Sequence, residues 1–262
     1  MSVELTDELR RLEITKGTGV LFVGDGAFQL TEGAITSADC LRTSGLARLV
    51  MEAGVATADD WRRAEGGDAS RLLEQPRLET LAMLSVFDAA YFLLASPSVP
   101  EFRPTPPHWL ATVCRITPHV LVHECERRGD PESTPWPAQL VDRAPVVPVR
   151  RGRRRRIVLT GGQAEVLAAA DARRSVAGIG DYLGRTSYGC LVAVRELTAA
   201  GLIEPPVQVM PAPSTTAPPV IEATPPPRRR RVRPTAPVPA PDRWKPVDPD
   251  LLVRLRAALE DA

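Results

Sequence analysis

The stretch from Arg173 to Ile203, RRSVAGIGDYLGRTSYGCLVAVRELTAAGLI, decides the fold of its part of the chain. Ser175 precedes an apolar run at helical spacing and is a candidate N-cap, and Gly184 supplies the positive φ angle expected just past a helix end. Ser187 is a second candidate N-cap. The run after it places one apolar helical face at Cys190, Val194 and Leu197. The pattern predicts two helices joined by a short turn, a helix-turn-helix.

The flanking residues extend this prediction. A further helix fits Gly162 to Ala172, and Ile157-Val158-Leu159 is typical of a short strand. Gly201 ends the last helix, and Leu202-Ile203 begin an extended segment. Strand, helix, helix, turn, helix and strand follow one another in the order of a winged helix, a fold that usually works by binding DNA or protein. A helical hairpin of another fold is the alternative.

Composition is that of an ordinary globular chain. It has 262 residues, of which 25% are charged and 44% hydrophobic, so one or two domains with their own cores are expected. The four cysteines form no CxxC pair, which fits reduced thiols and a cytoplasmic location. We expect no signal peptide. The longest apolar run, near residues 83–95, contains Asp88 and is too short to span a bilayer.

Charge is distributed unevenly. Residues 1–137 carry 13 Lys or Arg and 20 Asp or Glu, whereas residues 138–205 carry 11 and 6, and residues 206–262 carry 9 and 6. An acidic first part beside a basic second part indicates a division of labour. The basic part could meet an anionic partner or the acidic part of a neighbour.

The first part of the chain predicts a small antiparallel meander followed by helices. Apolar runs at 19–23 and 27–30 flank Gly24-Asp25-Gly26, a hairpin turn signal, and residues 34–38 fit a third strand. Helices are expected around Leu46 to Ala53, over Leu78 to Leu94, and over Trp109 to Arg128 with an interruption near Pro118. Phe102 fits an edge strand.

This order carries a resemblance. GVLFVGDGAFQLTEGAITSADC, then LARLVMEAGVATADDW, then LETLAMLSVFDAAYFLLASPSVPEFRP, resembles a PATAN-type domain. Members of that family are regulatory protein-interaction modules of bacterial signalling, without catalytic residues. The later segment, with its LTAAGLI ending, is similar to MarR-like and actinobacterial winged-helix regulators. The resemblance implies a PATAN-like interaction domain fused to a winged helix.

The expected fold class is therefore α+β. Its predicted parts are a PATAN-like domain at 1–130, a Pro-rich linker at 131–149, a winged helix-turn-helix domain at 150–205, a disordered Pro/Arg-rich linker at 206–247 and an amphipathic C-terminal helix at 248–262. That last helix could dock on its own chain, on a second copy or on a partner.

No catalytic constellation is evident. Walker A loops and assembled nucleophile triads are lacking in the sequence, and we expect no enzyme activity and no cofactor. His119 and His123 stand four residues apart near Cys125 and could face a metal, but a third ligand is not obvious and ordinary surface imidazoles are the favoured interpretation. Asp59-Asp60 fits an N-cap or a solvated pair.

Two arginine clusters favour nucleic acid, since arginines near phosphates bind through charge without reading sequence. One precedes the winged helix and the other lies at 228–233; charge runs can equally solubilise the chain or bind acidic proteins. The candidate DNA-binding residues are Arg150, Arg151, Arg153, Arg154, Arg155, Arg156, Arg185, Ser187, Tyr188 and Arg195.

The last helix tests this hypothesis. If Cys190, Val194 and Leu197 face the core, the residues expected to face outward are Ser187, Tyr188, Leu191, Val192 and Arg195. Base readout needs polar side chains there, so an apolar spot argues equally for protein binding. The candidate partner-binding residues are Leu191, Val192, Leu251, Leu252, Leu255 and Leu259.

Two functions remain open at this stage. The leading hypothesis is a non-enzymatic bacterial transcriptional or signalling regulator that binds DNA through its winged helix. The alternative is an adaptor in a small-GTPase or roadblock-type signalling complex, with the winged helix and the C-terminal helix bound to proteins. A homodimer or an assembly role for the C-terminal helix is a further possibility, and no membrane insertion is expected.

Overall fold

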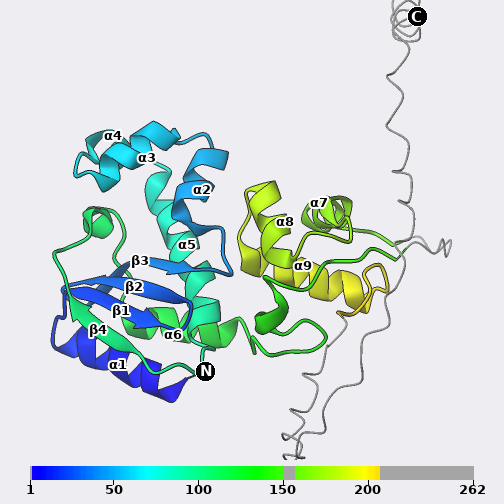
Figure 1. Ribbon diagram of the computed structural model, residues 1–262, viewed down its shortest axis with the longest axis horizontal. Helices are drawn as coiled ribbons and strands as arrows, with labels where there is room; N and C mark the ends of the chain where they lie inside the picture. Colours follow the sequence, from blue (N-terminus) through cyan, green and yellow to red (C-terminus); the bar gives the residue numbers. More distant parts are fainter. Residues whose placement is uncertain (1, 150–156, 207–262) are drawn as a thin grey trace, which may run out of the picture. The chain divides into compact units, whose positions relative to one another are not determined.

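The computed structural model describes residues 2–149 and 157–206. Its sheet has four antiparallel strands, β1 (Gly19–Val23), β2 (Gly26–Thr31), β3 (Ala34–Cys40) and β4 (Glu101–Pro104), in the order β3-β2-β1-β4 (Figure 1). Gly24 adopts a φ of 54° in the β1–β2 turn, as the hairpin signal predicted. The meander and the edge position of Phe102, in β4, are confirmed.

The first helix of the structure was not predicted. α1 (Val3–Ile14) precedes the sheet and buries Leu5, Leu9 and Leu12, which are spaced by four and three residues along one face. Its remaining positions are mostly polar or charged, and α1 contacts α6 (Pro118–Arg127). Three leucines are enough for a helix when another helix covers them.

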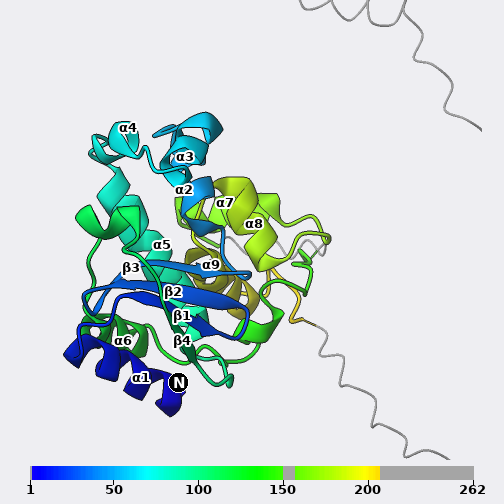
Figure 2. The ribbon, with the colours of Figure 1, turned by 60° about the vertical axis from the view of Figure 1, so that its left-hand side comes forward.

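The central helix is α5 (Leu78–Leu93), which packs against β3, α2 (Gly45–Glu52) and α6 (Figure 2). Two short helices, α3 (Ala58–Glu65) and α4 (Ser70–Leu73), lie between α2 and α5 in the chain. Thr57 caps α3 in a reciprocal capping box with Asp60. We call residues 2–130 the sheet domain.

Pro118 divides the region predicted as one interrupted helix, as expected. A 3-10 turn, η1 (Trp109–Thr112), precedes it, and Pro118 occupies the first turn of α6, where the missing N–H costs nothing. Ile116 between them exchanges two backbone hydrogen bonds with Ile35 on β3. The interruption therefore fixes α6 to the sheet.

Three helices form the second half of the described chain: α7 (Gly161–Ala169), α8 (Val176–Leu183) and α9 (Ser187–Ala199). Ser175 caps α8, and Gly184 ends it with a φ of 61°, both as predicted. Thr186, and not Ser187, caps α9 by accepting the N–H of Gly189. α8 and α9 are joined by a short turn and pack against each other, as predicted.

One other prediction for this half is wrong. Residues 157–159 form no strand, and Val158 is 96% exposed. The extended pair Leu202-Ile203 instead bonds with residues 147–149, which lie before the gap in the described chain. Within the described residues no strand returns after Ile203, so the fold is α+β, and the winged helix-turn-helix stays a prediction.

The segment predicted as a Pro-rich linker belongs to the second half. It contains the 3-10 turn η2 (Ala138–Leu140), and Trp136, Val141 and Val146 are fully buried. The Trp136 indole N–H donates to the hydroxyl of Thr198 on α9. The prolines give this segment an irregular backbone, but it is packed into the core and does not separate two domains as a linker would. We call residues 131–149 and 157–206 the helical module.

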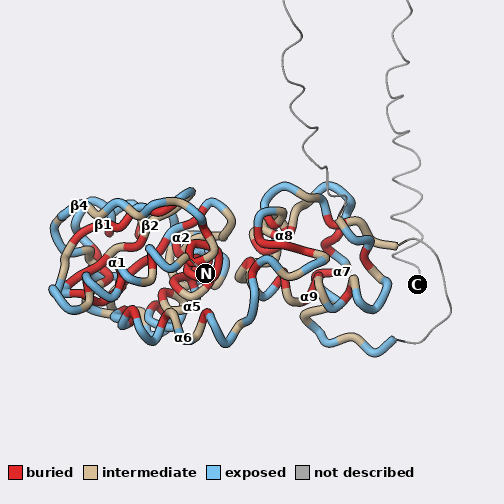
Figure 3. The backbone as a smooth tube through the Cα atoms, turned by 90° about the horizontal axis from the view of Figure 1, so that it is seen from below, coloured by how far each residue is buried: buried red, intermediate tan, exposed pale blue. Residues whose placement is uncertain are grey.

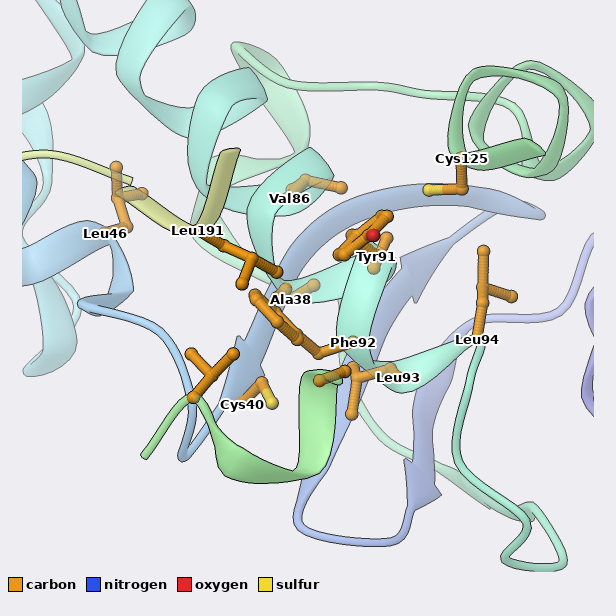
Figure 4. Packing of buried hydrophobic residues seen from close by; sticks show 14 of the residues in the cluster. Ala38, Cys40, Leu46, Val86, Tyr91, Phe92, Leu93, Leu94, Cys125 and Leu191 are labelled. Carbon is orange, nitrogen blue, oxygen red and sulfur yellow. The ribbon is translucent and has the colours of Figure 1, made fainter. Parts of the chain in front are cut away.

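Buried residues lie in both halves of the described chain (Figure 3), and they belong to one hydrophobic cluster. Leu191 of α9 lies in the same cluster as Val86 and Phe92 of α5 and Ala38 of β3 (Figure 4). Because α9 contributes to this cluster, it is covered both by its own module and by the sheet domain.

Candidate functional site at the joint between α5 and α9

A buried carboxylate joins the two halves. Asp88 on α5 is 2% exposed and accepts the backbone N–H groups of Ser187 at 2.9 Å and Tyr188 at 2.7 Å. These N–H groups belong to the first turn of α9, which has no partners for them within the helix and carries partial positive charge. The sheet domain therefore supplies a second cap to the helix that a helix-turn-helix would use for binding.

Burial governs the charge of Asp88. Desolvation raises the pKa of its carboxyl to about 6, while the N–H groups of Tyr188 and Ser187 and the charge of Arg128 oppose that rise. The Arg128 guanidinium lies 4.7 Å from the ring centre of Tyr188 and donates to the carbonyl of Phe87 at 2.9 Å. Asp88 is thus held chiefly by backbone dipoles of the facing helix.

Arg195 links α9 to the start of the helical module. Its guanidinium donates to the carbonyls of Pro131 at 2.8 Å, Ser133 at 3.3 Å and Trp136 at 2.8 Å. A further N–H donates to the hydroxyl of Tyr91 on α5 at 3.3 Å. Because its N–H groups donate to these oxygens, Arg195 holds α9 against the start of the helical module and against α5. The prediction that Arg195 faces outward is wrong.

The outward-facing assignment fails for the neighbouring residues too. Ser187 and Leu191 are fully buried, and Tyr188 is half-buried with its ring 4.7 Å from that of Tyr91. The sequence argument assumed one buried face, which Cys190, Val194 and Leu197 do form. A second buried face lies against α5. The exposed residues of α9 are Gly189, Glu196 and Ala199.

A hollow of about 430 Å³ opens beside this joint. Leu81 and Leu84 of α5 form one wall, Val192 of α9 forms another, and the first turns of α7 and α9 complete it. Leu84 is 45% exposed, and Val192, predicted to bind a partner, is half-buried. We call this hollow the α5–α9 groove.

Polar pairs line the edge of the groove. The exposed Arg185 bonds Glu165 of α7 at 2.6 Å, and Gln163 donates to Glu196 of α9 at 2.8 Å. Arg185 is one of the predicted DNA-binding residues and is the one of the described set that stands at the surface. An apolar floor with a mixed-charge edge is typical of a protein-binding groove.

Some predicted site residues fall outside the described chain. They are Arg150, Arg151, Arg153, Arg154, Arg155 and Arg156 in the first arginine cluster, and Leu251, Leu252, Leu255 and Leu259 near the C-terminus.

The side chains considered as metal ligands, His119, His123 and Cys125, do not line the α5–α9 groove. His119 pairs with Glu13 on α1 at 2.9 Å, and Cys125 is buried. Among residues 2–149 and 157–206, no three His, Cys, Asp or Glu side chains gather as metal ligands would. Burial raises the pKa of the Cys114 thiol to about 11 and of the Cys190 thiol to about 12, so both are protonated at neutral pH and are poor nucleophiles.

Sequence reasoning missed the partner of α9. Asp88 stood out as the one acidic residue in an apolar helical run, which is a signal for a buried polar contact, but nothing local indicates that the contact is the first turn of a helix 99 residues away.

Comparison with known proteins adds no relative: no protein-family model, curated protein or solved structure matches the chain. The described residues form an α+β fold, in which a four-stranded antiparallel sheet with its helices is followed by three further helices. None of the helices in the described part is long and apolar enough to cross a membrane.

Proposed function

We propose that this chain is a non-enzymatic regulatory protein that acts by binding another protein through its helical module. One observation carries the proposal: the polar side chains that base readout would require on α9 are turned inward. Ser187 is buried, Arg195 is bonded to carbonyls, and Glu196 is the one charged residue on the exposed face. An acidic exposed face opposes approach to a phosphate backbone.

The α5–α9 groove is the surface that best suits a partner. Its apolar walls can take the apolar face of an amphipathic helix, as grooves between helices commonly do. The exposed Glu196 at its edge accepts a hydrogen bond from the neutral Gln163 and favours a helix with a basic residue beside its apolar face. This role agrees with the adaptor hypothesis and with the interaction role that the PATAN resemblance implies for the first domain.

The test is a loss of partner affinity on a groove variant. Leu84→Asp places a charge on the groove wall at a position already 45% exposed, and Leu41→Asp is the matched control at a position 80% exposed and outside the groove. Partners of the full chain would be captured from nuclease-treated extract, purified and titrated directly. We expect Leu84→Asp to weaken binding by about tenfold or more and Leu41→Asp to leave it unchanged.

DNA binding is the competing function, supported by the arginine cluster at 150–156 in the sequence. Fluorescence anisotropy of the full chain with a labelled mixed-sequence duplex, at low and at high salt, separates the two. Salt-dependent binding that disappears when the six arginines become alanine would replace our proposal with the DNA-binding one. If wild type, Leu84→Asp and Leu41→Asp bind the partner with equal affinity, the groove is not the binding site.

A further inference from the structure

The α5–α9 groove presents apolar side chains that the described residues leave partly uncovered. Leu84 on its wall is 45% exposed and stands beside a hollow of about 430 Å³. Leu81 and Val192 line the same hollow. A concave surface with apolar walls and a few polar groups at its edge is the usual form of a binding site. A segment of the same chain is the nearest candidate to fill it.

The sequence outside the described residues narrows the choice of segment. Residues 150–156, RRGRRRR, contain no apolar side chain. Residues 207–247 contain 12 prolines, and no more than six residues stand between successive ones. Proline breaks a helix interior, so this stretch cannot offer a helical face of two turns or more. Residues 250–262, in contrast, run for 13 positions without a proline.

The apolar residues of that last stretch recur at helical spacing. Leu251, Leu255 and Leu259 are each four residues apart, and Leu252 is adjacent to the first. At 100° per residue these four leucines share one face of a helix, and Val253 falls on the opposite side. Amphipathic helices lay such a face into grooves between helices. The leucine face therefore matches the apolar walls of the groove.

Charge favours the same pairing. The exposed Glu196 at the groove edge accepts a hydrogen bond from the neutral Gln163, which leaves its charge for a cation. Arg185, the cation at this edge, is already held in an ion pair with α7. The charged residues between the first and last leucine of the segment are Arg254 and Arg256, and its carboxylates stand outside that span. At helical spacing the two arginines flank the leucine face, so either side of the helix can meet the acidic edge.

The length of the chain permits the contact. The described residues end at Pro206 in the helical module, which supplies α7 and α9 to the groove. The 41 residues of 207–247 can span at most about 135–150 Å. A compact body of about 200 residues has a radius of gyration of only about 16 Å. The last segment can therefore reach the groove of its own chain, and the covalent connection raises its effective concentration there.

We propose that residues 248–262 are an intramolecular ligand of the α5–α9 groove, with the leucine face on Leu84 and Val192 and an arginine beside Glu196. A partner protein that binds the groove must then displace this segment, which makes the segment a regulator of the site. That consequence rests on the proposed function, whereas the contact within the chain needs no partner.

A spin label on the segment tests the contact in the full chain. The four natural cysteines are buried, so a new cysteine is the site that a thiol reagent labels selectively. Ala257→Cys suits this purpose, because at helical spacing position 257 faces away from the leucines. The label broadens the NMR signals of nearby amides. We expect Gly189 and Val192 in the groove to lose most of their intensity and Gly33, which lies against α1, to keep it.

Aspartate variants of the labelled chain make the test specific. Leu255→Asp places a charge on the leucine face, and Leu84→Asp places one on the groove wall. We expect each to restore the lost signals, because a buried carboxylate without a partner is costly. Val253→Asp is the matched control on the other side of the segment and should leave the broadening unchanged.

A mixed sample separates this chain from a second copy. Isotope-labelled chain without the new cysteine is combined with spin-labelled chain of natural isotope content. Broadening of the groove signals in that mixture would assign the groove to a neighbouring copy and overturn the proposal. Unbroadened groove signals in the single-chain sample, or broadening that survives Leu255→Asp, would reject the contact. Partner titrations take no part in these results, so the segment and the proposed function fail independently.

Discussion

Arg195 on α9 donates a hydrogen bond of 3.3 Å to the phenol oxygen of Tyr91 on α5, although the two residues are 104 positions apart in sequence. The same guanidinium bonds three backbone carbonyls of residues 131–136. It therefore fastens α9 to the segment that begins the module and, through Tyr91, to the sheet domain.

Arg195→Lys should destabilise the chain, because an ammonium cannot reproduce the planar set of donors that serves these carbonyls. We expect a loss of about 1.5–3 kcal/mol in the free energy of unfolding, measured by urea titration. Affinity for a DNA duplex should not change. A variant with wild-type stability and weaker DNA binding would show that Arg195 serves DNA and not the fold.

Leu191→Ala should cost about 2–5 kcal/mol, since the side chain is fully buried between α9 and α5 and its removal leaves a cavity. Val192→Ala, one residue away and half-buried at the groove, should cost clearly less. Urea unfolding of both variants checks the order. Similar, small losses for both would mean that Leu191 is accessible in solution and that α9 is not covered as described.

Gly184 offers a test of the turn between α8 and α9. Gly184→Ala forces an alanine into a φ of 61°, and its Cβ would stand 2.9 Å from the Cβ of Glu52 on α2. Gly201→Ala is the control, with a φ of 73° and open space. The left-handed conformation costs each variant about 1–2 kcal/mol, so the greater loss expected for Gly184→Ala measures the approach of the turn to α2. Equal losses would indicate that the turn and α2 separate readily.

Asp88 should make stability depend on pH in an unusual direction. Its pKa is raised from 3.8 to about 6 by burial, so the folded chain binds this proton more tightly than the unfolded chain does. Its contribution is fully present below pH 4 and is lost as the pH rises through 6, by about 3 kcal/mol in all. Carboxyls with lowered pKa values, such as Glu8 and Asp171, act in the opposite sense.

The test is therefore the difference in the free energy of unfolding between wild type and Asp88→Asn as a function of pH. The free energy of unfolding of Asp88→Asn, subtracted from that of wild type at each pH, removes the contributions of the other carboxyls. The difference should fall between pH 4 and 6.5. A difference that stays flat over that range would mean that the carboxylate of Asp88 is better solvated than its position indicates.

Local patterns in the sequence predicted local structure well. The glycines of the β1–β2 turn, Pro118 and the Ser175 and Gly184 helix boundaries each indicate a backbone feature through their own conformational or capping preference, and each was placed correctly. The faces of α9 were not, because apolar spacing shows which residues are buried without showing how many neighbours bury them. Leu191 and Ser187 are covered by a helix a hundred residues earlier, and no local rule encodes that contact.

The fully buried Trp136 has a further consequence for experiment. It is the tryptophan of the described helical module, whereas Trp61 and Trp109 pack edge to face, 5.5 Å between ring centres, in the sheet domain. The fluorescence difference between wild type and Trp136→Phe therefore isolates emission from the module. Comparison of wild type with Trp136→Phe therefore follows the unfolding around Trp136 in the helical module without an added dye.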